Sequence, residues 1–193
     1  MPFDLETWAK SPLDDQMRAA EAASAEDLRD MALGFNWTIQ REPVLACILD
    51  KQSISMATAT TAFFNADPER FNYIPHRQLP ETLHATTRLL DWVCDRINTG
   101  GYAHARGEGT PHTKRIRKWL DFQKADIDEN TRGRWVLMPE RLTLLMADPV
   151  RQTAESLADS AVYTGNRHPR ASRKRSGRAL FQIFDWRGTD VLT

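Results

Sequence analysis

The chain has 193 residues, of which 41% are hydrophobic and 27% are charged, and its formal net charge is zero. This length is enough for one main domain with a hydrophobic core, and no apolar run approaches the ~20 residues needed to cross a bilayer. The stretch MPFDLETWAKSP carries acids where a secretory signal needs basic residues and an apolar region. These features exclude a membrane-spanning protein and predict a soluble, cytoplasmic one.

The zero net charge conceals two unequal halves of the sequence. Residues 1–103 contain 9 Lys+Arg and 15 Asp+Glu, which gives −6, whereas residues 104–193 contain 17 and 11, which gives +6. This division favours docking between parts of the chain or a basic surface for an acidic partner. The two cysteines, Cys47 and Cys94, lie in apolar helical contexts without a second thiol nearby, so we predict that both pack as small apolar residues.

The first predicted helix precedes Ala23 and places Leu13, Met17 and Ala20 on one face. A second helix begins at Ser24, which can cap it. The apolar stripe of this second helix is formed by Leu28, Met31, Ala32 and Phe35.

The second helix has a capping residue at its start and an Asn-Trp pair at its end. Asp27 can return a hydrogen bond to the cap at Ser24. Asn36 tolerates the left-handed backbone common at helix ends, and Trp37 can fold back over the apolar face. A packed indole is the structural interpretation of this pair, and a ligand or partner contact by Trp37 is the alternative.

Three further helices are predicted before the glycine-rich, polar stretch GYAHARGEGTPHT, residues 101–113, which is expected to be a loop. Pro43 suits the first turn of one. Another is predicted from Ser53 or Ser55 to Asn65; it is apolar or small nearly all round and therefore central, with a buried strand as the alternative. Asp67-Pro68 ends it. The periodicity is clearest over residues 80–98, where a helix is ended by Gly100-Gly101.

These segments resemble a known family. LRDMALGFNW, a helix led by proline, ATATTAFFNADP and DWVCDRINTGGY follow one another as in the bacterial family called domain of unknown function number 4274. The matching residues, within about residues 24–105, are Leu28, Ala32, Asn36, Trp37, Pro43, Thr61, Ala62, Phe63, Phe64, Asp67, Pro68, Gly101 and Tyr102. The resemblance implies a helical fold and transfers no catalytic residue, because the family has no assigned activity.

The second half contains further amphipathic segments. KRIRKWLDFQKA predicts a basic helix with Ile116, Trp119, Leu120 and Gln123 on its inner side, and Pro139 begins another helix that Asp148-Pro149 ends. A helix is also predicted over VRQTAESLADSAVY. GNRHPRASRKRSGR then has the composition of a disordered tail, and the apolar ALFQIFDW after it is expected to dock as a short strand or helix.

Together these patterns predict a mainly α protein, a compact helical bundle with a basic C-terminal extension. We divide the chain into an N-terminal helical segment (1–23), a helical core (24–105), further helices packed on the core (106–163) and a basic segment with an apolar terminus (164–193).

Two sets of polar residues are weighed as sites. A metal site would use His76, His84, Asp91 and Asp95, with His104 or His112. Arg88 lies on the same helix face, between His84 and Asp91, and favours a surface stripe of salt bridges instead. An acid-base enzyme would use Asp67, Glu69, His76 and Glu81.

We favour a non-enzymatic protein-binding role, as a bacterial accessory, inhibitor or immunity-type protein without a cofactor or metal. The residues assigned to protein binding are Trp37, Arg173, Lys174, Arg175, Phe181, Phe184 and Trp186. The alternative is nucleic-acid binding, because a run of cations can neutralise phosphates. The residues assigned to it are Arg170, Arg173, Lys174, Arg175 and Arg178. An enzyme with a histidine-carboxylate site is the third hypothesis.

Overall fold

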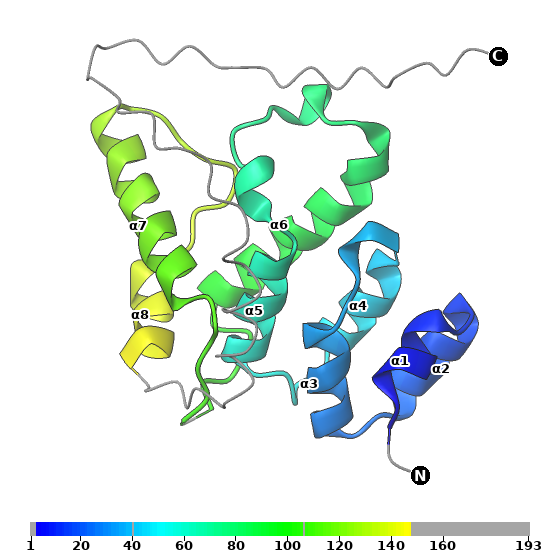
Figure 1. The fold of residues 1–193 in the computed structure, drawn as a ribbon. Helices are drawn as coiled ribbons and strands as arrows, with labels where there is room; N and C mark the ends of the chain where they lie inside the picture. The colour runs from blue at the N-terminus through cyan, green and yellow to red at the C-terminus, as the bar shows by residue number, and fades with distance from the viewer. Residues whose placement is uncertain (1–2, 40, 106, 148–193) are drawn as a thin grey trace, which may run out of the picture. The chain divides into compact units, whose positions relative to one another are not determined.

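The computed structural model describes residues 3–39, 41–105 and 107–147, all within one compact unit that spans Met1–Arg151 (Figure 1). This part of the chain is mainly helical, as predicted, and holds no strand beyond an isolated bridge between Ser55 and Ala103. Its α-helices are α1 (Leu5–Lys10), α2 (Leu13–Ala22), α3 (Ala25–Leu33), α4 (Glu42–Leu49), α5 (Met56–Asn65), α6 (His84–Asn98), α7 (Thr113–Asp128) and α8 (Pro139–Ala147). Short 3-10 turns are η1 (Trp37–Ile39), η2 (Pro68–Arg70), η3 (His76–Gln78) and η4 (Glu81–Leu83).

Helix α5 is the central element, as its composition predicts. Every residue from Met56 to Phe64 is buried, and the helix contacts both α3 and α6. Ser55 caps it by accepting a hydrogen bond from the Thr58 amide at 3.2 Å. Tertiary packing therefore offsets the weak helix propensity of its threonines.

The N-terminal helices pack differently from the prediction. Leu13 is 43% exposed, whereas Gln16 is 2% exposed. The Gln16 side-chain amide donates to the carbonyls of Trp8 and Ala9 at 2.9 and 3.0 Å, and the Trp8 indole donates back to the Gln16 carbonyl at 3.3 Å. Of the predicted apolar face, Ala20 is buried and Met17 packs against the core, whereas the placement of Leu13 is wrong. The hydrogen bonds of Gln16 hold α1 against the Gln16 side of α2.

Helix α3 has the predicted cap and a different end. Ser24 accepts from the Asp27 amide at 3.2 Å, and the two side chains meet at 2.8 Å. Asn36 is not in the left-handed region, which among described non-glycine residues holds Asp67 and Asn130. Its Oδ1 instead accepts from the Thr38 amide at 2.9 Å, so the side chain makes the turn and a left-handed backbone is not needed.

The long helix near residue 80 begins later than expected, because η4 precedes α6 with a single 3-10 turn. Thr86 of α6 donates to the buried Glu42 carboxylate of α4 at 2.5 Å.

Cys94 is buried and Cys47 is half-buried. Burial, and then the charges of Asp91 and Asp95, raise the pKa of Cys94 to about 12, which keeps it a thiol near neutral pH.

No helix among the described residues has the length and apolar character needed to span a bilayer. The predicted helix over VRQTAESLADSAVY and the whole basic segment lie outside the described residues.

Candidate functional site

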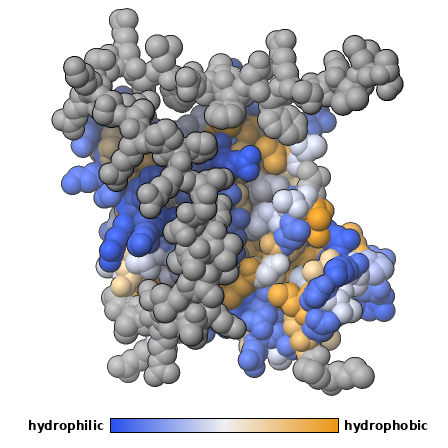
Figure 2. Space-filling view, in the orientation of Figure 1, coloured by the Kyte–Doolittle hydropathy of each residue, from blue (hydrophilic) through white to orange (hydrophobic). Residues whose placement is uncertain are grey.

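Helix α7 is held to the core by one face. Ile116 and Trp119 are 0% and 3% exposed. The Trp119 indole meets the rings of Phe63 and Phe64 edge to face, at centroid distances of 6.0 and 5.7 Å. Such pairs add to the stabilisation from buried area. Exposed cations elsewhere on the helix are Lys114, Arg117, Lys118 and Lys124, and Figure 2 shows hydrophilic side chains gathered over α7.

Gln123 joins α7 to the chain that follows it. Its Oε1 accepts from the Trp119 indole at 2.7 Å and from the Leu137 amide at 2.8 Å. Its Nε2 donates to the Leu137 carbonyl at 2.9 Å. The half-buried Gln123 therefore fixes residues 129–138, which we call the return segment, along α7.

Two side chains outside α7 complete the positioning of the return segment. Asn72 accepts from the Trp135 amide at 2.9 Å through its Oδ1 and from the Arg134 amide at 2.7 Å through its carbonyl. The Asp91 carboxylate of α6 accepts from Arg134 Nε and Nη2 at 2.8 and 2.7 Å. It also accepts from the Trp135 indole at 2.8 Å. The segment is thus anchored on three elements, and its side chains alternate between core and surface.

This alternation creates an apolar groove beside α7. Trp135 and Leu137 point inward, at 1% and 0% exposure, and leave Val136 and Met138 on the surface at 36% and 50%. The cavity between α7 and the return segment measures about 560 Å³. We call this the α7 groove, and its apolar lining is Leu120, Ile127, Val136 and Pro139.

Ile127 is the most exposed large apolar residue of the described chain, at 78%. Together with Val136 and Met138 it places apolar side chains in and beside a hollow that no described residue fills. A concentration of exposed apolar surface around a concave site is typical of binding surfaces.

Charged residues also line the groove. The carboxylate of Asp126 is hydrogen-bonded: it accepts from the Tyr73 hydroxyl at 3.0 Å and from the Gly133 amide at 3.2 Å. Lys124 and Arg132 also line the groove, and among described residues neither makes an ion pair. Partial burial, and then the hydrogen bond to Asp126, raise the pKa of Tyr73, so its hydroxyl stays a donor at neutral pH.

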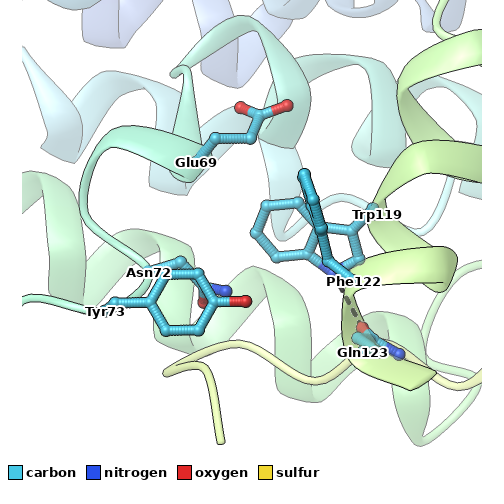
Figure 3. A pocket seen from close by; sticks show the side chains of 6 residues that line it. All are labelled: Glu69, Asn72, Tyr73, Trp119, Phe122 and Gln123. Carbon is cyan, nitrogen blue, oxygen red and sulfur yellow. Dashed lines mark hydrogen bonds between the residues drawn. The ribbon is translucent and has the colours of Figure 1, made fainter. Parts of the chain in front are cut away.

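A second, much smaller hollow lies beside α7 (Figure 3). It measures about 60 Å³, room for little more than water, and is lined by Glu69, Asn72, Tyr73, Trp119, Phe122 and Gln123. Tyr73 and Phe122 are 48% and 44% exposed, so the apolar surface continues around the helix.

Two of the four residues considered as an acid-base set, Asp67 and Glu69, are paired with one arginine. Arg115 donates to Glu69 at 3.0 and 2.6 Å and to Asp67 at 3.0 Å. Partial burial opposes ionisation of Glu69, but the hydrogen bonds from Arg115 hold its pKa below the usual value. His76 lies elsewhere, with its ring stacked on His84 at a centroid distance of 4.7 Å. The neutralised carboxylates are therefore positioned as structural ion pairs.

His112 lies near the ion pairs of Arg115 with Asp67 and Glu69. It is not part of the acid-base set expected from the sequence. Its Nε2 lies 2.8 Å from Asn65 Oδ1, and the Asn65 amide donates to the Leu33 carbonyl at 3.3 Å. The Asn65 oxygen is thus the acceptor, and His112 Nε2 carries the proton. Burial, and then the charge of Arg115, lower the pKa of His112, which keeps the ring neutral at pH 7.

The groups considered as metal ligands do not converge on one site among the described residues. Asp91 is bound by Arg134 and Trp135, and no set of three or more His, Cys, Asp or Glu that could hold a metal ion occurs within the described residues. The stripe of salt bridges expected at Arg88 is also not found there: Asp91 pairs with Arg134 instead.

Trp37 is half-buried and packs edge to face on Phe35 at a centroid distance of 5.4 Å, so it folds back as predicted. Its Nε1 is buried without a hydrogen-bond partner among described residues. The other residues assigned to protein or nucleic-acid binding lie outside the described residues: Arg170, Arg173, Lys174, Arg175, Arg178, Phe181, Phe184 and Trp186.

Sequence reasoning missed the α7 groove. The available signal was the alternation in RWVLMP, in which Val136 and Met138 occupy every second position. No family model, curated protein or solved structure matches this sequence.

Proposed function

We propose that this protein binds another protein through the α7 groove. The observation that carries the proposal is Ile127 of α7, which is 78% exposed beside a cavity of about 560 Å³. An accessory or inhibitor role needs such a surface and no reacting groups. Trp119, Gln123 and Asn72 support the groove by fixing its walls, which lowers the entropic cost of binding.

The test compares two variants that place the same charge at two different exposed apolar residues. Ile127→Asp places a charge in the groove, and Leu13→Asp places one at a residue of α2 that is 43% exposed. Immobilised full-length wild type and both variants are incubated with a lysate of the source cells, and retained proteins are quantified by mass spectrometry. We expect one protein to be retained by wild type and Leu13→Asp and lost with Ile127→Asp.

The purified partner then allows a quantitative measurement. An interface residue that dominates binding contributes at least about 2 kcal/mol, so Ile127→Asp should raise Kd about 30-fold or more. Equal retention by Ile127→Asp and wild type would remove the groove from the proposed function.

A further inference from the structure

We infer that the smaller hollow beside α7 binds a small methylated ammonium group, carried either by a free amine or by a lysine side chain. We call this site the aromatic hollow, and its lining is Glu69, Asn72, Tyr73, Trp119, Phe122 and Gln123. The inference goes beyond the proposed function and does not rest on the α7 groove. It follows from the rings around the hollow, from the one charged residue that lines it and from its size.

Three of the six lining residues are aromatic, and Figure 3 shows Tyr73 and Phe122 on either side of the hollow with Trp119 between them. Trp119 is 3% exposed and its indole donates to Gln123, whereas Tyr73 and Phe122 are 48% and 44% exposed. A buried ring therefore forms the base of the hollow, and two exposed rings form its rim. The faces of aromatic rings carry partial negative charge and attract a cation within about 6 Å, tryptophan most strongly.

One of these rings already lies beside an ammonium group. Lys118 is one turn earlier on α7 and does not line the hollow, and its Nζ lies 5.3 Å from the centroid of the Phe122 ring. On the other side, the Tyr73 hydroxyl donates to the Asp126 carboxylate at 3.0 Å, which makes the Tyr73 ring richer in electrons. Both observations favour a cation over a neutral group between the rings.

Glu69 is the one charged residue of the lining, and it is an acid. Its carboxylate accepts from Arg115 Nε and Nη2 at 3.0 and 2.6 Å. A carboxylate has about four acceptor positions, so capacity is left for an N–H of the ligand. The charges of Arg115 and Lys118 act on Glu69 and oppose a further cation, so the ring faces supply most of the attraction.

The size of the hollow favours a small, methylated head group. Its volume of about 60 Å³ is about twice the ~30 Å³ that one water occupies in the liquid, which matches an ammonium with one or two methyl groups. An unmethylated ammonium is strongly hydrated and brings three N–H donors. The hollow offers them few acceptors, since the amide of Gln123 is already bonded to Trp119 and Leu137. Methyl groups replace these donors by apolar surface that packs on the rings.

Three matched probes test the inference on the full-length protein. They are the Nα-acetyl methylamide of Nε-dimethyl-lysine, the same compound without the two methyl groups, and a neutral isostere with carbon in place of the ε-nitrogen. NMR titration follows the assigned indole N–H signal of Trp119. We expect the dimethylated probe to bind at least about fivefold more tightly than either of the others.

Variants at the rim test the rings and the charges separately. Phe122→Leu removes an exposed ring and keeps an apolar side chain, so it should weaken binding of the dimethylated probe about fivefold. Phe122→Tyr keeps the ring and should bind as wild type does. Lys118→Gln removes a neighbouring cation, and it should strengthen binding of the dimethylated probe and leave the neutral isostere unaffected.

Dimethylamine, tested alone, distinguishes the two sources of the ligand. Binding equal to that of the lysine probe would support a free amine, and binding at least tenfold weaker would support a lysine side chain. Equal binding of the neutral isostere, unchanged binding in Phe122→Leu, or no binding of any probe would overturn the inference. Ile127 does not line this hollow, so Ile127→Asp should leave probe binding unchanged, and the α7 groove is judged separately.

Discussion

At the scale of single residues, Asp91 fixes the groove wall from a distance in the sequence. One carboxylate accepts from Arg134 and from the indole of Trp135, a side chain that is 1% exposed. Asp91→Ala would leave a buried indole N–H and a partly buried guanidinium without partners. We expect the free energy of unfolding to fall by about 2–3 kcal/mol, measured by urea denaturation followed by circular dichroism.

Asp95 provides the control for this prediction, because it lies one turn later on α6 and is exposed. Asp95→Ala should change the free energy of unfolding by less than about 0.5 kcal/mol, as is usual for a surface substitution. Equal losses in the two variants would show that the Asp91 hydrogen bonds contribute little.

Gly133 has a steric role in the same wall. A Cβ at this position would lie 2.2 Å from the Asn72 side-chain nitrogen, and Asn72 cannot move freely because it accepts from the Trp135 amide. Gly133→Ala should therefore destabilise the fold by roughly 1–3 kcal/mol, the usual cost of overpacking. In urea denaturation, the double variant Gly133→Ala/Asn72→Ala should lose less than the two single variants added together, since the clash needs both side chains. Strict additivity would contradict it.

At the scale of elements, the contact between α5 and the start of α7 should weaken in acid. The pKa of His112 is lowered in the folded state from a usual value of 6.5, by burial and then by Arg115. The unfolded chain binds that proton more readily, so the contribution of neutral His112 is present above about pH 6.5 and is lost as the pH falls below it. Urea denaturation at pH 7.5 and pH 5.5 should show this loss of stability.

His112→Gln is the matched variant for the pH experiment. A glutamine amide can donate to Asn65 in place of the imidazole Nε2, but it does not titrate. The difference in unfolding free energy between the two pH values should therefore shrink in His112→Gln. An unchanged difference would assign the acid sensitivity to other groups.

The elements that sequence predicts well are those whose signals are local. Ser24 caps its helix at the expected place, Ser55 is one of the two starts expected for α5, and α5 is central because its residues are small or apolar nearly all round. The exposure of Leu13 and the burial of Gln16 on α2 were missed, because hydrogen bonds to α1 bury the Gln16 side chain. The groove was missed because it also depends on side-chain hydrogen bonds between distant parts of the sequence. Asn72 and Asp91 lie 63 and 44 residues from Trp135, whose amide and indole they accept from.

At the scale of the whole molecule, the two hypotheses for function are protein binding in the α7 groove and nucleic-acid binding by the basic run. The salt dependence of binding distinguishes them. Residues 104–193 carry a net charge of +6, and Arg170, Arg173, Lys174, Arg175 and Arg178 supply much of it. Binding of single-stranded nucleic acid by these cations should weaken steeply with salt, with a slope of log K against log salt near −0.7 for each neutralised phosphate. Docking in the apolar groove should depend on salt only weakly, because burial of apolar surface dominates it.

Fluorescence anisotropy of a labelled oligonucleotide, measured from about 50 to 200 mM salt, tests the nucleic-acid alternative. The double variant Arg173→Glu/Arg175→Glu removes two cations from the run and adds two acids, so the slope should flatten by at least about 1.4 if both residues contact phosphates. Ile127→Asp should leave this slope unchanged, because the groove takes no part in phosphate neutralisation. Oligonucleotide binding that is equal at both ends of the salt range would exclude the electrostatic alternative and leave the groove as the functional surface.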